Sequence, residues 1–233
     1  MRSTFTFNNT TSTTYNVLVE HAAPIQRGEE RVNNIIIPGR AGDLTVIEGE
    51  DIYNAYIQSI TINVPSDKLS AVRSWLRGSG WLTFSNESDK KQEARVINQI
   101  TYEKVPHSIS WYRADVQFYC QPIKRLLTDP TDSIASGGYI KNEGDLPMYP
   151  KITLTGSGDM TVTVLQKTLS IEDVPNGGCV IDCEANMVTN SAGTESLMAQ
   201  VSGDFPVVPV GTTYTLTYTG ATACSVVRRQ RYL

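Results

Sequence analysis

The sequence predicts a mainly β protein made of two domains, the first of which contains one α-helix. Threonine, valine, isoleucine and tyrosine dominate short segments in which apolar and polar residues alternate, a period of two that is typical of half-buried antiparallel strands. Frequent turn residues separate these segments, which favours sandwiches or open barrels. A chain of 233 residues can form two small domains, each with its own core. We therefore expect an N-terminal β-sandwich-like domain with one helix, followed by a C-terminal β-sandwich.

In the first half, one segment breaks the alternation and predicts the helix. Leu69, Val72 and Leu76 recur at helical spacing within residues 66–78. Ser66 opens this segment and is the expected N-cap of the helix. Gly78 or Gly80 can supply the left-handed residue that ends the helix. The strands expected around it are Ile57–Val64, Glu93–Val105 and Tyr112–Cys120.

A stretch rich in proline and glycine, residues 118–158, joins the two halves. Proline lacks an amide donor and glycine costs ordering entropy, so neither suits the middle of a sheet. We expect strand pairing of the first domain to end near Pro122 and the second sandwich to begin near Asn142. This assigns residues 1–134 to the N-terminal domain and residues 135–233 to the C-terminal domain. The strands expected in the second half are Ile152–Thr155, Met160–Leu165, Tyr214–Thr219 and Ser225–Arg229.

Charge and hydropathy argue against nucleic-acid binding and membrane insertion. The formal net charge is −4, which gives no basic footprint for nucleic acid or an anionic membrane. The strongest basic cluster, Arg228–Arg231, is either a nucleic-acid contact or, more simply, a solvated edge or a subunit contact. Residues 1–24 lack the apolar core of a signal peptide, and no run is apolar enough to span a bilayer. We therefore expect a soluble protein made in the cytoplasm.

The residues that most often carry chemistry form no catalytic or metal-binding pattern. The two histidines, His21 and His107, lie beside turn residues. Cys179 and Cys183 have a spacing seen in some metal sites, but they also fit one apolar face of a strand. Asp182 and Glu184 stand two apart on an expected strand, either as the acid/base pair of a hydrolase or as a solvated face. We expect no catalytic residues, no metal, no cofactor and no enzyme activity.

One segment has the pattern of a subunit contact. Residues 32–37 place branched apolar side chains in succession, which predicts burial on both faces, either inside the core or beneath a neighbouring subunit. A Pro-Gly turn follows, in which the arginine either serves the turn or makes a charge-assisted contact across subunits. The candidate interface residues are Val32, Ile35, Ile36, Ile37, Arg40 and Leu44.

Several motifs resemble, in order, those of the distal tail (Dit) family of long-tailed bacteriophages and prophages. Residues 35–44 resemble the family's I-P-G-R-x-G-x-L element, and residues 118–122 resemble its F-x-C-x-P strand end. Residues 142–152 look like the N-x-G-x-P-x-I start of its C-terminal domain, with more prolines than the pattern requires. Residues 180–184 and 203–211 resemble its I-D-x-E strand and its G-x-F-P-x-x-x-x-G segment.

The resemblance implies a structural hub protein of the virion, at the distal end of the tail. It implies a hexameric ring, built by the N-terminal domain, between the tail tube protein and the tail-tip or tail-associated protein. It also implies that the C-terminal sandwich is galectin-like and projects as a docking platform, in some members for receptor-binding proteins. An alternative is a carbohydrate-binding module. All three tryptophans lie in the first half, which leaves the second half without the aromatic most suited to stacking on sugars.

Overall fold

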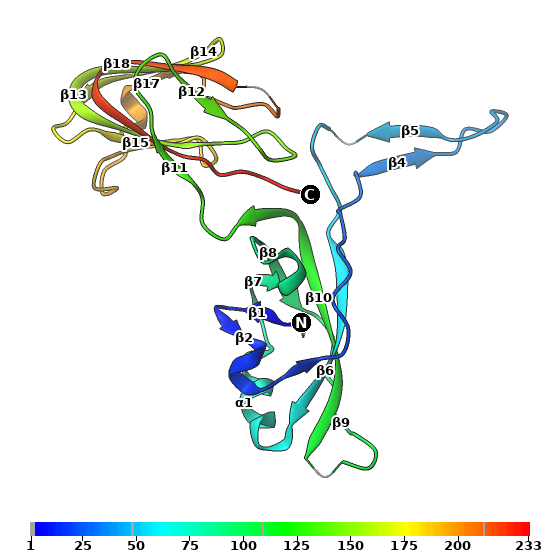
Figure 1. Cartoon of the computed structure of the whole chain (residues 1–233). Helices are drawn as coiled ribbons and strands as arrows, with labels where there is room; N and C mark the ends of the chain where they lie inside the picture. The colour runs from blue at the N-terminus through cyan, green and yellow to red at the C-terminus, as the bar shows by residue number, and fades with distance from the viewer. Residues whose placement is uncertain (1–2, 48, 109, 212) are drawn as a thin grey trace. The chain divides into compact units, whose positions relative to one another are not determined.

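A computed structural model of the chain describes residues 3–47, 49–108, 110–211 and 213–233. These residues form two compact units (Figure 1). The first comprises the described residues up to Leu127 together with Leu233, and the second comprises those from Thr128 to Tyr232. Within the described residues there is one α-helix, and antiparallel strands make up most of the regular structure. The expectation of a mainly β chain with one helix is confirmed.

The first unit is built on one antiparallel sheet that runs β2-β1-β7-β8-β10-β6-β3, with β9 paired to β10. Its strands are β1 (Phe5–Phe7), β2 (Thr10–Thr11), β3 (Leu18–Val19), β6 (Tyr56–Pro65), β7 (Ser79–Phe84), β8 (Lys90–Val96), β9 (Glu103–Lys104) and β10 (Trp111–Leu126). The long strand expected over 93–105 is interrupted at 97–102, because β8 and β9 pair with different parts of β10.

Helix α1 (Leu69–Trp75) covers the inner face of this sheet. Its Trp75 ring stacks on Phe5, with 5.2 Å between ring centroids, and its indole Nε1 donates a hydrogen bond of 2.8 Å to the carbonyl oxygen of Phe7. The predicted N-cap is wrong: Ser66 begins a short 3₁₀ turn (Ser66–Lys68) that precedes the helix, and neither helix start has a side-chain cap. Gly78 has the positive φ expected after the helix end, at 75°.

Strand β10 confirms the alternation predicted for its first half. Ala114, Val116, Phe118 and Cys120 are buried in the core of the first unit, whereas Arg113 and Asp115 on the opposite face are exposed. The strand does not end near Pro122, however. After an irregularity between Cys120 and Lys124, it continues to pair with β8 as far as Leu126. The proline fits because it lies within that irregularity, where the ladder does not use its missing amide.

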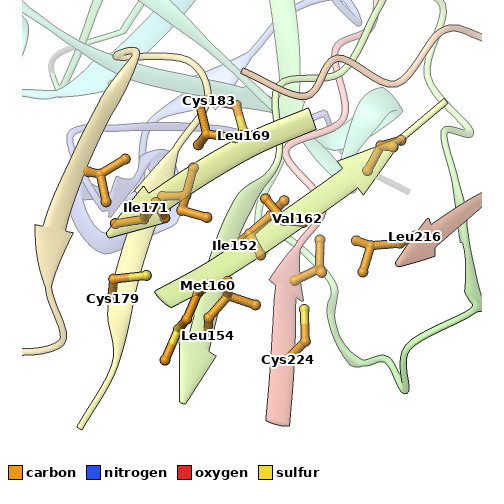
Figure 2. Packing of buried hydrophobic residues seen from close by; sticks show 14 of the residues in the cluster. Ile152, Leu154, Met160, Val162, Leu169, Ile171, Cys179, Cys183, Leu216 and Cys224 are labelled. Carbon is orange, nitrogen blue, oxygen red and sulfur yellow. The ribbon is translucent and has the colours of Figure 1, made fainter. Parts of the chain in front are cut away.

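The second unit is a β-sandwich in which two long strands contribute to both layers. Its strands are β11 (Thr131–Ser133), β12 (Gly138–Lys141), β13 (Lys151–Val164), β14 (Lys167–Val174), β15 (Cys179–Asp182), β16 (Met187–Asn190), β17 (Val201–Gly203) and β18 (Thr213–Val227). The first half of β13 pairs with β15, and its second half pairs with β14. Along nearly its whole length β13 also pairs with β18. Figure 2 shows how side chains from both halves, such as Leu154 and Val162, meet in one core.

Glycines allow these two strands to bend where they pass between layers. The pairing of β13 with β18 shifts at Gly156, and Gly220 on β18 lies at the same bend with φ of 76°. A Cβ on Gly220 would lie 2.0 Å from the carbonyl oxygen of Asp159, so no larger residue fits there. Each of β13 and β18 therefore replaces two of the shorter strands expected from the sequence.

The second unit begins earlier than residue 135. Residues 131–133 form β11, whose partner is the end of β18, and Ile134 belongs to the hydrophobic core of the second unit. Thr131 lies opposite Val227, and the amide of Arg228 donates to the carbonyl of Pro130. The segments by which the chain enters and leaves this unit are thus hydrogen-bonded neighbours.

Candidate assembly interface

The six candidate residues lie together on a β-hairpin of the first unit. Strand β4 (Val32–Ile35) pairs with β5 (Leu44–Ile47), and among the described residues neither strand pairs with any other. Figure 1 shows this pair as a ribbon apart from the eight-stranded sheet. We call residues 29–54 the hairpin arm.

The arm exposes apolar side chains on both of its faces. Opposed residues in an antiparallel pair point to the same side, so Ile35, Leu44 and Val46 share one face. Val32 and Ile47 lie on the other face, beside the hydrogen-bonded pair formed by Thr45 and Asn34. All of these apolar residues are exposed, and Ile36 reaches 80%. Of the two interpretations of residues 32–37, the internal strand is wrong, because nothing in the described chain covers them.

Turn chemistry shapes the tip of the arm. The amide of Arg40 donates to the carbonyl of Ile37, and Gly39 between them has φ of 83°, as the third residue of a type II turn requires. Gly42 also has a positive φ. The Arg40 side chain is exposed, and no described residue forms an ion pair with it. It is therefore available to a partner.

The base of the arm is closed by backbone hydrogen bonds between its two strands. The amide of Arg31 donates to the carbonyl of Ile52, and the amide of Asn54 donates to that of Glu29. Gly28, just before the base, is buried, and a Cβ there would lie 2.6 Å from the Cβ of Pro122. These contacts hold the two strands of the base together while the apolar tip stays uncovered.

A second exposed apolar group, which the sequence analysis missed, lies on the outer face of the eight-stranded sheet. Arg95, Tyr119 and Ile57 are paired in one row across β8, β10 and β6. Trp81 lies two residues along β7 from Ser79, which is paired with Arg95. A shallow depression of about 500 Å³ lies between Trp81, Arg95 and Tyr119. We call Ile57, Trp81, Arg95 and Tyr119 the outer-face patch.

The pair of carboxylates considered for hydrolysis forms an ion-pair cluster. Arg229 donates to both carboxylate oxygens of Asp182, at 2.7 and 2.9 Å, and lies 3.4 Å from Glu184. Burial opposes ionisation of Asp182, but the hydrogen bonds from Arg229 and from two backbone amides outweigh it, so the pKa of Asp182 lies below its ordinary value. A carboxyl held in its ionised form does not serve as a general acid at neutral pH.

The other arginines of the C-terminal cluster are also engaged within the second unit. Arg228 pairs with Asp132 and lies near Glu143, while Arg231 stacks over the ring of Tyr149 and donates to the carbonyl of Pro147. Because their side chains bind protein groups, the basic cluster predicted at Arg228–Arg231 is a structural network.

The cysteines are part of the two cores. All four are unpaired and buried, and Figure 2 shows Cys179, Cys183 and Cys224 among apolar side chains of the second unit. Burial raises the pKa of Cys183 to about 12, so its thiol is protonated at neutral pH. In the described part of the chain, no three His, Cys, Asp or Glu side chains lie close enough to hold a metal ion. Nor does that part contain a helix with the length and apolar character to cross a membrane.

Comparison with known proteins gives a match to a solved structure along the whole chain. No protein-family model and no curated protein sequence matches the chain. The crystal structure of SPP1 Dit (gp 19.1), described as a paradigm of the hub adsorption apparatus in phages that infect Gram-positive bacteria, matches with a TM-score of 0.81. The match covers 100% of both chains at 17% sequence identity. The chain has the fold of this Dit protein.

This correspondence includes both units, so the resemblance drawn from the motifs is confirmed at the level of the fold. A chain of the phage p2 baseplate, in its activated conformation with Sr, also matches over 98% of both chains. Its TM-score is 0.49 and its identity is 9%, values too low to establish a shared fold.

Proposed function

We propose that this chain is a structural protein of a phage tail that forms a ring at the distal end of the virion's tail. The ring joins the tail tube protein to the tail-tip or tail-associated protein, and it is assembled in the host cytoplasm. The observation that carries this proposal is the Dit fold, matched along the whole chain with a TM-score of 0.81. The structure adds an exposed apolar arm, which is the kind of surface that assembly would cover.

The first unit forms the ring in this proposal, most simply a hexamer of one chain. Closed rings use heterologous contacts, in which one surface of a subunit meets a different surface of the next. Val32, Ile35, Ile36, Ile37, Arg40 and Leu44 supply one of these surfaces from the hairpin arm. Burying branched apolar side chains is the main favourable term in such an association.

The second unit serves as a docking platform for the adsorption apparatus, including receptor-binding proteins. Its sandwich has a continuous core of its own, so it presents rigid outer surfaces. Its role is structural and not enzymatic: the Asp182 carboxylate is neutralised by Arg229, and the four thiols of the chain are buried.

The molar mass of the full chain in solution tests the proposal. Light scattering and native mass spectrometry, with and without the tail tube protein, are expected to show a closed oligomer, most simply six chains. Negative-stain images are expected to show a ring with a central opening. Ile36→Asp is expected to abolish the oligomer without unfolding the chain, because this side chain is exposed in the isolated subunit but would place a charge in the contact.

Val210→Asp is the matched control, since it adds the same charge at an exposed apolar residue of the second unit and is expected to leave the ring intact. A chain that stays monomeric at the highest attainable concentration, also with tube protein present, would show that the proposed function is wrong.

A further inference from the structure

The proposed ring requires a surface that receives the arm. A heterologous contact joins two different surfaces, and both must be present on every copy of the chain. The arm supplies an apolar face made by Ile35, Leu44 and Val46. Its counterpart should be an exposed surface of the same chain with apolar side chains and a compatible charge.

The outer-face patch has the composition of an interface centre. Tryptophan, tyrosine and arginine are the residues most enriched among those that dominate binding energies, and here one of each surrounds a single depression. Ile57, Trp81 and Tyr119 are 49%, 36% and 42% exposed, although they project from the middle strands of a sheet. Solvent-facing positions of such strands are usually polar. An uncovered apolar row at these positions is therefore best explained by a partner.

Charge favours the arm as that partner. The described acidic residues at the base of the arm are Glu29, Glu30, Glu50 and Asp51, against one arginine, Arg31. On the outer-face patch Arg95 is exposed, and no described carboxylate forms an ion pair with it. The Lys91 ammonium lies 5.0 Å from the centre of the Trp81 ring, which adds positive charge beside the patch, while Glu93 offsets part of it.

We propose that the outer-face patch of one chain receives the hairpin arm of a second copy. The Ile35, Leu44 and Val46 face of the arm lies against Trp81, Tyr119 and Ile57, with the acidic base of the arm toward Arg95 and Lys91. This inference rests on the proposed ring and names the surface that closes it. Each subunit then gives its arm to one neighbour and receives the arm of the other.

Cross-linking between two introduced cysteines tests this pairing in the full chain. Asn33→Cys places a thiol on the apolar face of the arm, since Asn33 is opposite Val46. Ser79→Cys places one beside the patch, since Ser79 is paired with Arg95. Both positions are exposed, whereas the four native cysteines are buried and stay unreactive toward a short bismaleimide.

The double variant is expected to give a covalent ladder that ends at the mass of the ring. An equal mixture of the two single variants is expected to give covalent dimers only, because each chain then carries one reactive thiol. Asn33→Cys combined with Ser202→Cys, an exposed position on β17 of the second unit, is the control and is expected to give no ladder.

The other outcomes overturn the pairing in distinguishable ways. A link formed within single chains would show that each arm folds onto its own sheet. An intact ring by native mass spectrometry without cross-linked chains would refute the patch as the receiving surface and leave the ring standing. The absence of any oligomer, with tube protein present, would overturn both the ring and this pairing.

Discussion

The buried Asn142 is expected to hold the second unit together, and replacing it with aspartate tests this with almost no change in shape. Its side chain is 1% exposed. The Nδ2 group donates to the carbonyl oxygens of Leu146 at 2.8 Å and Val208 at 3.1 Å, and Oδ1 accepts from the amide of Gly144 at 2.9 Å. The asparagine thus connects the start of the sandwich to a segment 66 residues away.

An aspartate at this position has no donor unless it is protonated. If the aspartate were ionised, the oxygen that replaces Nδ2 would face the carbonyl oxygens of Leu146 and Val208 in a buried site. Keeping it protonated at pH 7, about three pH units above its ordinary pKa, costs about 4 kcal/mol. The protonated acid donates only one of the two bonds, which costs about 1 kcal/mol more. Asn142→Asp should therefore lower the free energy of unfolding by about 5 kcal/mol at pH 7, a large part of the 5–15 kcal/mol of a typical domain.

Acid should partly reverse this loss. Because the folded state raises the pKa of the introduced carboxyl, folding takes up a proton, and the difference from the wild type should shrink as the pH falls from 7 to 4. Near pH 4 about 1 kcal/mol should remain, the value of the one lost hydrogen bond.

Urea unfolding followed by two signals measures this effect. All three tryptophans, at positions 75, 81 and 111, belong to the first unit, so their emission reports that unit, while far-UV circular dichroism reports both. Asn176→Asp, at an exposed turn of the second unit, is the control and should change stability by less than about 0.5 kcal/mol. A loss below about 1 kcal/mol at pH 7, or one that does not shrink in acid, would refute the reasoning.

Two further predictions concern one residue in each unit. Trp75→Phe keeps the stacking on Phe5 but leaves a buried carbonyl of β1 without its indole donor, so urea unfolding should show a loss of about 1–3 kcal/mol. Equal stability of the variant and the wild type would contradict a role for that bond. The lowered pKa of Asp182 makes the ion pair with Arg229 stabilising above the ordinary pKa of aspartate, and this contribution is lost as the pH falls through the lower folded pKa. Asp182→Asn should therefore be less stable than the wild type at pH 7, and the two should converge below about pH 4; parallel curves from pH 7 to pH 2 would count against it.

Local patterns predicted those features that depend on neighbouring residues in the chain. The period of two placed Val116 and Phe118 of β10 in the core, and helical spacing located α1 to within a few residues. The candidate residues of the arm were also brought together, because a Pro-Gly turn between two apolar runs specifies a hairpin. What the pattern did not decide was whether a neighbour within the chain covers that hairpin.

Features that depend on distant residues were not predictable in this way. Tyr119 on β10 and Trp81 on β7 form one patch only because β8 lies between their strands in the sheet. The glycines at 156 and 220 looked like strand ends, yet they are bends within continuous strands because each lies against the other strand. Nothing near Asn142 in the sequence shows that its amide reaches Val208.

The junction between the two units at residues 127–128 bears on how such chains change over time. The chain crosses from the first unit to the second at residues 127–128, and only Leu233 is assigned back to the first unit. Exchanging the second unit for another folded module would thus require one new junction near residue 127, and no loop of the first unit would have to be closed around it. The surface that the second unit displays can therefore diversify while the fold of the first unit stays the same.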